Sequence, residues 1–213
     1  MATVRVLRVF TDVAGESGNQ LGVVCDTGEI DRAGRQAIAA ELGYSETVFV
    51  EDETRLQIFT PTTELPFAGH PLVGAAWLLG QPVLHPPAGA VRTGVLGNRA
   101  WILARAEWSP VFERRQLGTP AEVDAFRPPR AGNLHVWAWQ DETRGRIRAR
   151  VFAPDLGVLE DPATGSASIA LCAALGGHLT IEQGPGCLIE VRPLENGLVE
   201  LGGRVADEGD REI

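Results

Sequence analysis

The sequence contains no lysine, because all 19 of its basic residues are arginine. Without a lysine amine, the protein cannot hold pyridoxal phosphate or a carbonyl substrate as a Schiff base, and it cannot form the lysine-containing phosphate loop of P-loop proteins. Cysteine is also scarce. The three cysteines, Cys25, Cys172 and Cys187, lie far apart without a CxxC or a metal-binding spacing. This pattern favours free thiols in a reducing compartment over disulfides or metal ligands.

Long apolar runs and an excess of positive charge are absent as well. No apolar run approaches the roughly 20 residues that cross a bilayer, and residues 1–5 lack the apolar core of a signal peptide. The net charge of −9 argues against nucleic acid or an anionic membrane as a general partner. We therefore expect a cytoplasmic protein that binds neither nucleic acid nor membranes.

An internal repeat organises the chain. Residues 64–71 (ELPFAGHP) are similar to residues 160–166 (EDPATGS). Glu64 matches Glu160 and Gly69 matches Gly165, both at a spacing of 96 residues. An apolar run follows each copy, at residues 72–79 and 167–175. Each copy has the pattern of a strand, an acidic Gly/Pro loop and a short apolar helix. The repeat predicts two similar halves that face each other across a shared site.

Most other segments show the alternation or β-branched composition of strands, and a third helix is expected from Asp31 to Leu42, ended by Gly43. The composition predicts an α+β protein dominated by sheet. The Pro/Gly-rich stretch at residues 80–90 suggests a division into residues 1–85 and 86–201. Residues 202–213 are expected to form an acidic, frayed tail.

Two segments of the second half are harder to assign. Residues 116–129 form a polar, Pro-rich interruption between strands. Arg146, Arg148 and Arg150 then alternate with apolar residues, which fits a solvated sheet face better than an anion-binding stripe.

The two repeated helices carry almost no polar residue on any face, so each must be surrounded by protein, most simply by a curved sheet. A glycine precedes each helix and frees first-turn N–H groups, which favour a carboxylate or an oxyanion. The alternative is two core helices that bind nothing. Because a titratable residue lies beside each glycine loop, we favour a binding role.

Three titratable residues are candidates for chemistry at these helix termini. His70 lies at the first terminus, Asp161 lies near the second, and Glu46 follows Ser45 at the start of a strand. Glu46 alone could be a solvated carboxylate, and His70 alone could be a structural histidine. Together, an imidazole and two carboxylates beside two oxyanion sites predict proton transfer at a carbon next to a carbonyl or carboxylate, without a metal or an organic cofactor.

Four motifs resemble the phenazine-biosynthesis PhzF-like family, in the correct order along nearly the whole chain: residues 18–24 (GNQLGVV), 45–49 (SETVF), 59–71 (FTPTTELPFAGHP) and 160–167 (EDPATGSA). The resemblance implies the fold of diaminopimelate epimerase, with two pseudo-symmetric lobes, each a β-barrel-like sheet around a central apolar helix. It further implies that residues 202–213 cross back to complete the N-terminal lobe, and that the protein is a homodimer.

The resemblance also assigns roles at matching positions. Glu46 matches the general acid/base carboxylate of the family, and His70 and Asp161 match its assisting residues. Gly69, Gly165 and Ser166 match the loops that bind the substrate carboxylate. The implied activity is a cofactor-independent isomerase or epimerase that relocates a proton on a small carboxylate-bearing metabolite in the cleft between the lobes.

Two features depart from the family pattern. The usual Gly-Asn-Pro is Gly18-Asn19-Gln20 here, and the chain is shorter than typical relatives, mostly in its second half. A degenerate site would leave a non-catalytic protein that binds a small molecule or a partner on the same fold. Nucleotide or phosphate-ester binding is disfavoured, because lysine is absent and the flanking loops are acidic.

Overall fold

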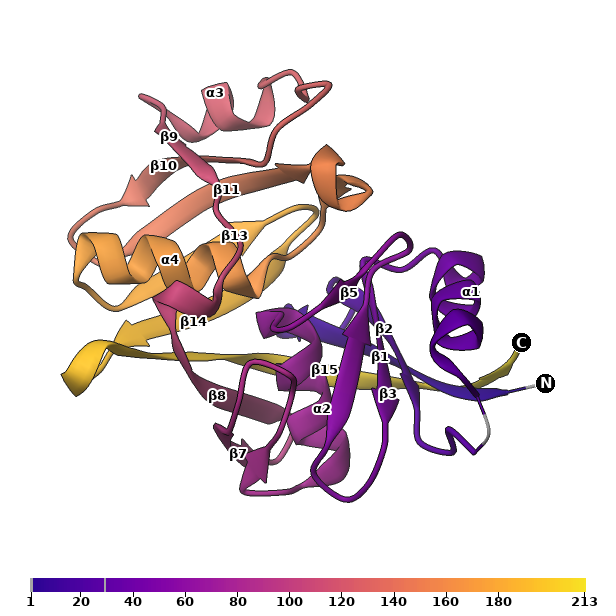
Figure 1. Ribbon diagram of the computed structural model, residues 1–213. Helices are drawn as coiled ribbons and strands as arrows, with labels where there is room; N and C mark the ends of the chain where they lie inside the picture. Colours follow the sequence, from indigo (N-terminus) through magenta and orange to yellow (C-terminus); the bar gives the residue numbers. More distant parts are fainter. Residues whose placement is uncertain (1, 29) are drawn as a thin grey trace.

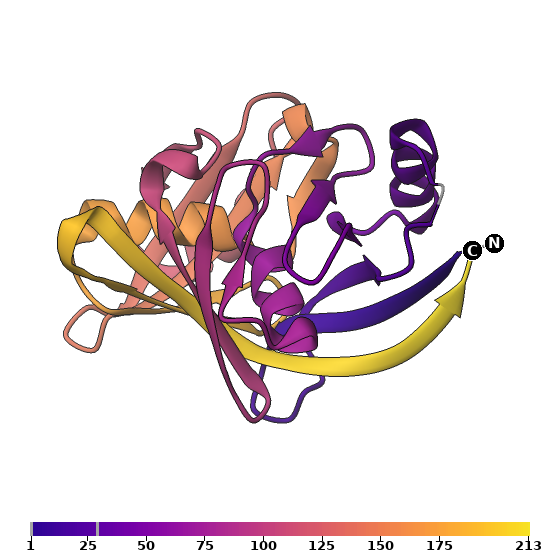
Figure 2. The same ribbon diagram turned by 60° about the horizontal axis from the view of Figure 1, so that its bottom comes forward.

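The structure is a computed structural model that describes residues 2–28 and 30–213; Met1 and Glu29, both in the predicted N-terminal lobe, lie outside the described residues. The chain forms two halves, each with a central helix against a curved sheet, and the long last strand runs through both (Figures 1 and 2). This arrangement confirms the predicted α+β class and the two facing halves.

The first half contains strands and two helices: β1 (Thr3–Thr11), β2 (Asn19–Val24), α1 (Arg32–Leu42), β3 (Glu46–Val50), β4 (Leu56–Phe59), β5 (Glu64–Leu65), α2 (Gly69–Leu79), β6 (Val83–Leu84), β7 (Val91–Leu96) and β8 (Arg99–Arg105). The second half contains β9 (Glu113–Gln116), α3 (Pro120–Asp124), β10 (Leu134–Asp141), β11 (Arg146–Ala153), β12 (Val158–Asp161), α4 (Gly165–Leu175), β13 (Leu179–Gln183), β14 (Cys187–Pro193) and β15 (Leu198–Glu212). Short 3₁₀ turns lie at η1 (Ala106–Trp108), η2 (Pro154–Leu156) and η3 (Glu195–Gly197).

The described strands join into one continuous sheet, with the order β5-β4-β3-β2-β1-β15-β14-β13-β11-β10-β9 along its main path. Strands β6, β7 and β8 branch from β15, and β12 pairs with β11. Several of the short strands were not predicted from the sequence. Helix α3 was not predicted either; it lies inside the predicted polar interruption and is capped by the Thr119 hydroxyl, which accepts a hydrogen bond from the Glu122 N–H.

The predicted helix after Asp31 is confirmed as α1. The Asp31 side chain accepts a hydrogen bond from the Gly34 N–H at 2.8 Å, as a helix N-cap should. Gly43 ends the helix in the left-handed conformation at φ 67°, and its N–H donates to the Ala39 carbonyl. The turn after α1 leads directly into β3, and Glu46 is the first residue of that strand.

The central helices α2 and α4 are buried to different extents. In α2, residues 69–76 are buried, as expected for a helix that is apolar all round. In α4 the first turns are buried, but residues 173–175 are exposed, so complete enclosure was a wrong expectation for its last turn. Among the described residues, none of the helices is long and apolar enough to cross a membrane.

Strand β15 links the two halves (Figure 2). Its first part pairs with β14 and β8, and residues 204–212 pair with β1 in the first half. The expectation of a frayed tail is therefore wrong, because the backbone of residues 204–212 hydrogen-bonds to β1. The charged side chains of this stretch form ion pairs, such as Arg5 with Asp210 at 3.0 Å.

The packing around α2 continues past residue 85. Strands β7 and β8 pack against α2, and β8 contributes the buried residues Ile102 and Ala104. We therefore propose that the N-terminal lobe extends to Arg105, beyond the boundary expected after residue 85.

The N-termini of α2 and α4 meet at the centre of the molecule. A Cβ atom built on Gly69 would lie 2.9 Å from the Gly165 carbonyl carbon, and one built on Gly165 would lie 2.8 Å from the His70 nitrogen. Both would also approach Leu201 of β15 within 2.7 Å. These glycines are therefore required by close backbone contact, which brings the two glycine loops together as the repeat predicted.

Replacing Gly165 by Ala is expected to lower the free energy of unfolding by about 1–3 kcal/mol, because the added methyl group overpacks the contact between the helix N-termini. The matched control is Gly177→Ala, where an added Cβ has no atom within 4 Å and the backbone is not left-handed. Urea unfolding of both variants measures the difference. Equal stability of the two would contradict the close contact.

Candidate active site

Glu46 and His70 form a buried polar pair. Glu46 is the first residue of β3, His70 is the second residue of α2, and their side chains are 13% and 2% exposed. The Glu46 Oε2 atom lies 2.9 Å from His70 Nδ1. Strand β3 runs parallel to β2, with Glu46 opposite Leu21, so the sheet of the first half holds the carboxylate against the helix N-terminus.

The second ring nitrogen of His70 determines where protons lie in this pair. Nε2 is 3.3 Å from the main-chain oxygen of Asn19, and a carbonyl oxygen only accepts hydrogen bonds, so Nε2 carries a hydrogen. Nδ1 then either accepts a proton from a neutral Glu46 carboxyl or, in the imidazolium, donates to the carboxylate. Glu46 and His70 thus share one mobile proton.

Asp161 lies at the end of β12 and is 5% exposed. Its Oδ1 accepts hydrogen bonds from Asn19 Nδ2 at 2.7 Å and Ser45 Oγ at 2.9 Å, and its Oδ2 accepts one from Thr164 Oγ1 at 2.6 Å. Burial, followed by the nearby Glu46 carboxylate, raises the pKa of Asp161 to about 6, while His70 and the hydroxyl donors act in the opposite direction. Asp161 can therefore exchange a proton near neutral pH.

Two helix N-termini face this acid/base group. Neither α2 nor α4 has a side chain that caps its first-turn N–H groups: Ala68 precedes α2, and the Thr164 hydroxyl that precedes α4 donates to Asp161 instead. Two uncapped termini with their positive dipole ends form a site suited to a carboxylate or an oxyanion.

A nearly closed pocket lies between the halves, with about 20 Å³ of free volume, room for about one water molecule. Of the predicted site residues, Glu46, Asp161 and Ser166 line it, whereas His70, Gly69 and Gly165 do not. The remaining walls are mostly apolar and are formed by Thr60, Leu65, Phe67, Ala68, Pro110, Phe112, Ala153, Leu156, Val158 and Thr164.

Several residues of this site were not predicted from the sequence. Asn19 and Ser45 lie within the motifs noted above, but their hydrogen bonds to Asp161 come from the opposite half of the chain. Gln183 donates to the Asp161 carbonyl at 2.7 Å and to Thr164 Oγ1 at 2.9 Å, and no sequence pattern pointed to it. Pro110 and Phe112 belong to the connection between the halves.

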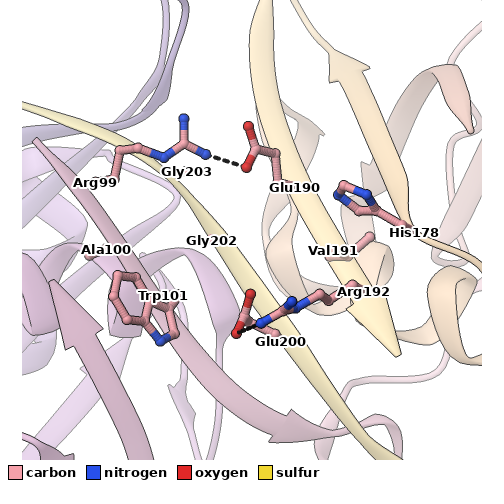
Figure 3. Close-up of a pocket in the computed structure, with 10 residues that line it drawn as sticks. All are labelled: Arg99, Ala100, Trp101, His178, Glu190, Val191, Arg192, Glu200, Gly202 and Gly203. Carbon is pink, nitrogen blue, oxygen red and sulfur yellow. Dashed lines mark hydrogen bonds and ion pairs between the residues drawn. The ribbon is translucent and has the colours of Figure 1, made fainter. Parts of the chain in front are cut away.

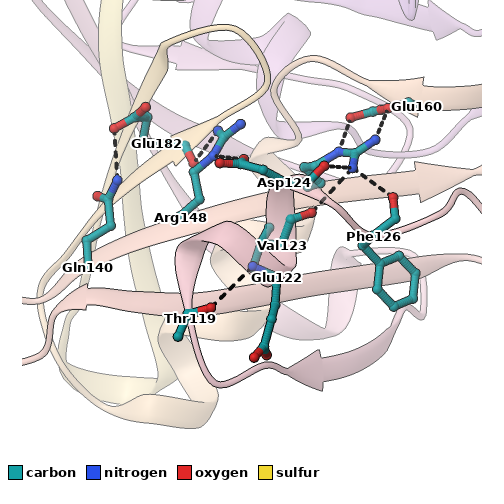
Figure 4. A network of polar contacts seen from close by, with 10 residues as sticks. Thr119, Glu122, Val123, Asp124, Phe126, Gln140, Arg148, Glu160 and Glu182 are labelled. Atoms are coloured by element: carbon teal, nitrogen blue, oxygen red, sulfur yellow. Dashed lines mark hydrogen bonds and ion pairs between the residues drawn. The ribbon is translucent and has the colours of Figure 1, made fainter.

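Arg148 and Arg150 of β11 are held by ion pairs and hydrogen bonds, as Figure 4 shows for Arg148, whereas Arg146 is exposed. Arg148 donates to Asp124 Oδ1 at 2.8 Å, and Arg150 binds both carboxylate oxygens of Glu160 at 2.7 Å. Arg150 also donates to three carbonyl oxygens at the end of α3, those of Val123, Asp124 and Phe126. The expected solvated face is therefore wrong for Arg148 and Arg150, which contact α3, and correct for the exposed Arg146.

A separate hollow of about 140 Å³ lies over β8, β14 and β15 (Figure 3). Its acidic side chains are already paired, Glu190 with Arg99 and Glu200 with Arg192. It contains none of the predicted site residues. None of the three cysteines lines the pocket between the halves, and burial raises the pKa values of Cys172 and Cys187 to about 11.

The chain is similar to known proteins both in sequence and in structure. The sequence matches the family described as phenazine biosynthesis-like protein over residues 7–98 and 120–192. A trans-2,3-dihydro-3-hydroxyanthranilate isomerase of Pseudomonas fluorescens is 30% identical, over 84% of this chain and 81% of that protein. An uncharacterized isomerase of Mesorhizobium japonicum is 48% identical, over 75% of this chain and 76% of that protein.

A solved structure, described as a predicted epimerase from Pseudomonas aeruginosa, matches with a TM-score of 0.78 and 26% identity, and the match covers 100% of this chain and 99% of that one. These similarities confirm the expected two-lobed epimerase fold and the expected enzyme class, an isomerase. The chain belongs to the phenazine biosynthesis-like protein family.

Proposed function

We propose that the protein is a cofactor-independent isomerase or epimerase that relocates a proton on a small carboxylate-bearing molecule in the pocket between the halves. The observation that carries this proposal is the 2.9 Å contact of Glu46 with His70, in a pocket that Asp161 also lines. A carboxylate that shares a proton with an imidazole, near a second carboxyl group of raised pKa, supplies both a base and an acid.

In the proposed reaction, the substrate carboxylate lies at the first turns of α2 and α4, near Gly69, Gly165 and Ser166. Glu46, in its ion-paired form with His70, takes a proton from the adjacent carbon. The electron pair of the broken C–H bond delocalises toward the carboxylate, where the uncapped N–H groups stabilise the added negative charge. The abstracted proton can exchange with solvent before Glu46 delivers a proton to another carbon. For epimerisation, the proton reaches the other face of the first carbon from Asp161, acting as the second acid.

Asp161 is proposed to orient the substrate or to act as the second acid. Its carboxyl group is held by donors from both halves of the chain, so its position depends on the two halves being together. Because the pocket has room for about one water molecule, a substrate must widen it on binding. Pro110 and Phe112, from the connection between the halves, line this pocket.

A two-step experiment tests this function. A thermal-shift screen of small carboxylates would include trans-2,3-dihydro-3-hydroxyanthranilate, the compound named for the Pseudomonas fluorescens relative. At 100 times its dissociation constant, a ligand stabilises the fold by about 2.7 kcal/mol. Each hit is then incubated with the protein in deuterium oxide and analysed by mass spectrometry. We expect deuterium at a carbon of at least one hit; binding without exchange would instead support a non-catalytic binding protein.

A further inference from the structure

Asn19, the first residue of β2, contacts both parts of the acid/base site and is 3% exposed. We infer that Asn19 is a positioning residue: its main-chain carbonyl fixes which nitrogen of His70 carries the hydrogen, and its side-chain amide holds the Asp161 carboxylate. This role rests on the proposed function and deepens it, because it couples the Glu46–His70 pair in one half of the chain to Asp161 in the other.

The main-chain contact imposes the His70 tautomer. If the hydrogen of a neutral ring lay on Nδ1, the lone pair of Nε2 would face the lone pairs of the Asn19 carbonyl at 3.3 Å. That arrangement is repulsive, so the hydrogen lies on Nε2 and Nδ1 is kept for Glu46. The Phe10 ring, with its centroid 6.3 Å from that of the imidazole, packs beside the ring.

The side-chain amide of Asn19 has only one favourable orientation. Its Nδ2 lies 2.7 Å from Asp161 Oδ1 and 3.2 Å from the Ala163 carbonyl oxygen, and both of these atoms are acceptors. A flipped amide would place its oxygen against these two acceptors and lose both hydrogen bonds. The orientation is thus fixed by the site, and the two N–H groups bind Asp161 and the chain segment that follows it.

The Asn19 amide affects the charge state of Asp161, which lies close to other titratable groups. Glu46 of β3, His70 of α2 and Cys187 of β14 are the titratable groups that influence or are influenced by its charge. Asn19 donates to the charged form of Asp161 and so favours the carboxylate over the carboxyl. Loss of this amide should raise the pKa of Asp161 further, because a buried carboxylate would keep fewer donors.

The wild-type protein alone provides the first test. Nitrogen-15 NMR of the histidine rings, with His70 assigned from the spectrum of His70→Gln, reports which ring nitrogen is protonated in the absence of substrate. We expect Nε2 of His70 to carry a hydrogen throughout the range in which the protein is folded. An unprotonated Nε2 would overturn the inference, whatever the protein is later found to catalyse.

The second test compares Asn19→Ala with Gln20→Ala. Gln20 is the next residue, and its side chain binds Glu208 on the surface at 2.8 Å, so its loss should not affect the site. By carbon-13 NMR of the carboxyl groups, we expect the Asp161 titration to move upward by about one pH unit in Asn19→Ala and not in Gln20→Ala. An unchanged Asp161 titration in Asn19→Ala would overturn the role of its amide.

With an exchanging substrate in hand, Asn19→Ala should lower kcat by about tenfold with little change in KM, and the limb of the pH profile governed by Asp161 should move to higher pH. A purely structural role would lower the amount of folded protein without moving that limb, and so would contradict the inference. If no compound shows exchange with the wild type, the proposed function fails, while both NMR results still decide the role of Asn19.

Discussion

Glu46→Gln is expected to lower the rate of solvent-deuterium incorporation by about a thousandfold, within the 10²–10⁴ range of general acid/base catalysis. The amide cannot accept the proton of the substrate, so the proposed proton transfer loses its base. The amide N–H₂ can still donate to His70 Nδ1, which now lies 2.9 Å from Glu46 Oε2, so the pair and the surrounding pocket should keep their geometry.

Binding should therefore survive this change, since the uncapped helix N-termini remain in place. Thermal shift with the same carboxylate measures binding, and mass spectrometry in deuterium oxide measures exchange. Glu41→Gln, at an exposed position of α1, is the matched control and should exchange at the wild-type rate. If Glu46→Gln exchanges as fast as this control, Glu46 is not the base.

The meeting of the two helix N-termini could be predicted because the internal repeat gives both helices the same glycine loop. Gly69 and Gly165 occupy equivalent positions in the two copies of the repeat, which predicted that the two helix N-termini meet. The structure brings the backbones of these two glycines into contact. The Glu46–His70 pair was expected as a gathering of titratable groups, and its 2.9 Å contact agrees with that expectation. Capping residues with local signals, such as Asp31 and Gly43, also predicted α1 correctly.

What the sequence did not predict depends on contacts between distant segments. Nothing local shows that Asn19 hydrogen-bonds to Asp161, 142 positions later in the chain. In composition the charged segment at residues 204–212 resembles a disordered tail; only the family resemblance implied that it crosses to the first half, where its pairing with β1 makes it a strand. Alternation in β11 likewise placed Arg148 and Arg150 on one face, but it could not show that α3 covers that face.

His135 should make the protein lose stability in acid, by about 3 kcal/mol between pH 7.5 and pH 4. This side chain on β10 is 0% exposed, and within residues 2–28 and 30–213 neither ring nitrogen has a hydrogen-bond partner. Burial, followed by the positive charge of Arg114, lowers the pKa of His135 to about 4. In the unfolded chain the same group takes up its proton near pH 6.5, so falling pH favours unfolding until the folded form is protonated too.

His135→Leu removes this titration and, because the lost nitrogens have no partners, should leave stability at pH 7.5 equal or higher. His178→Leu, at an exposed histidine, is the matched control. Asp161 acts in the opposite direction, since its raised pKa adds stability as pH falls from about 6, but it does so equally in both variants. Urea unfolding should thus show an acid loss about 3 kcal/mol smaller in His135→Leu than in His178→Leu. Equal losses would mean that His135 is not the group whose protonation destabilises the folded protein.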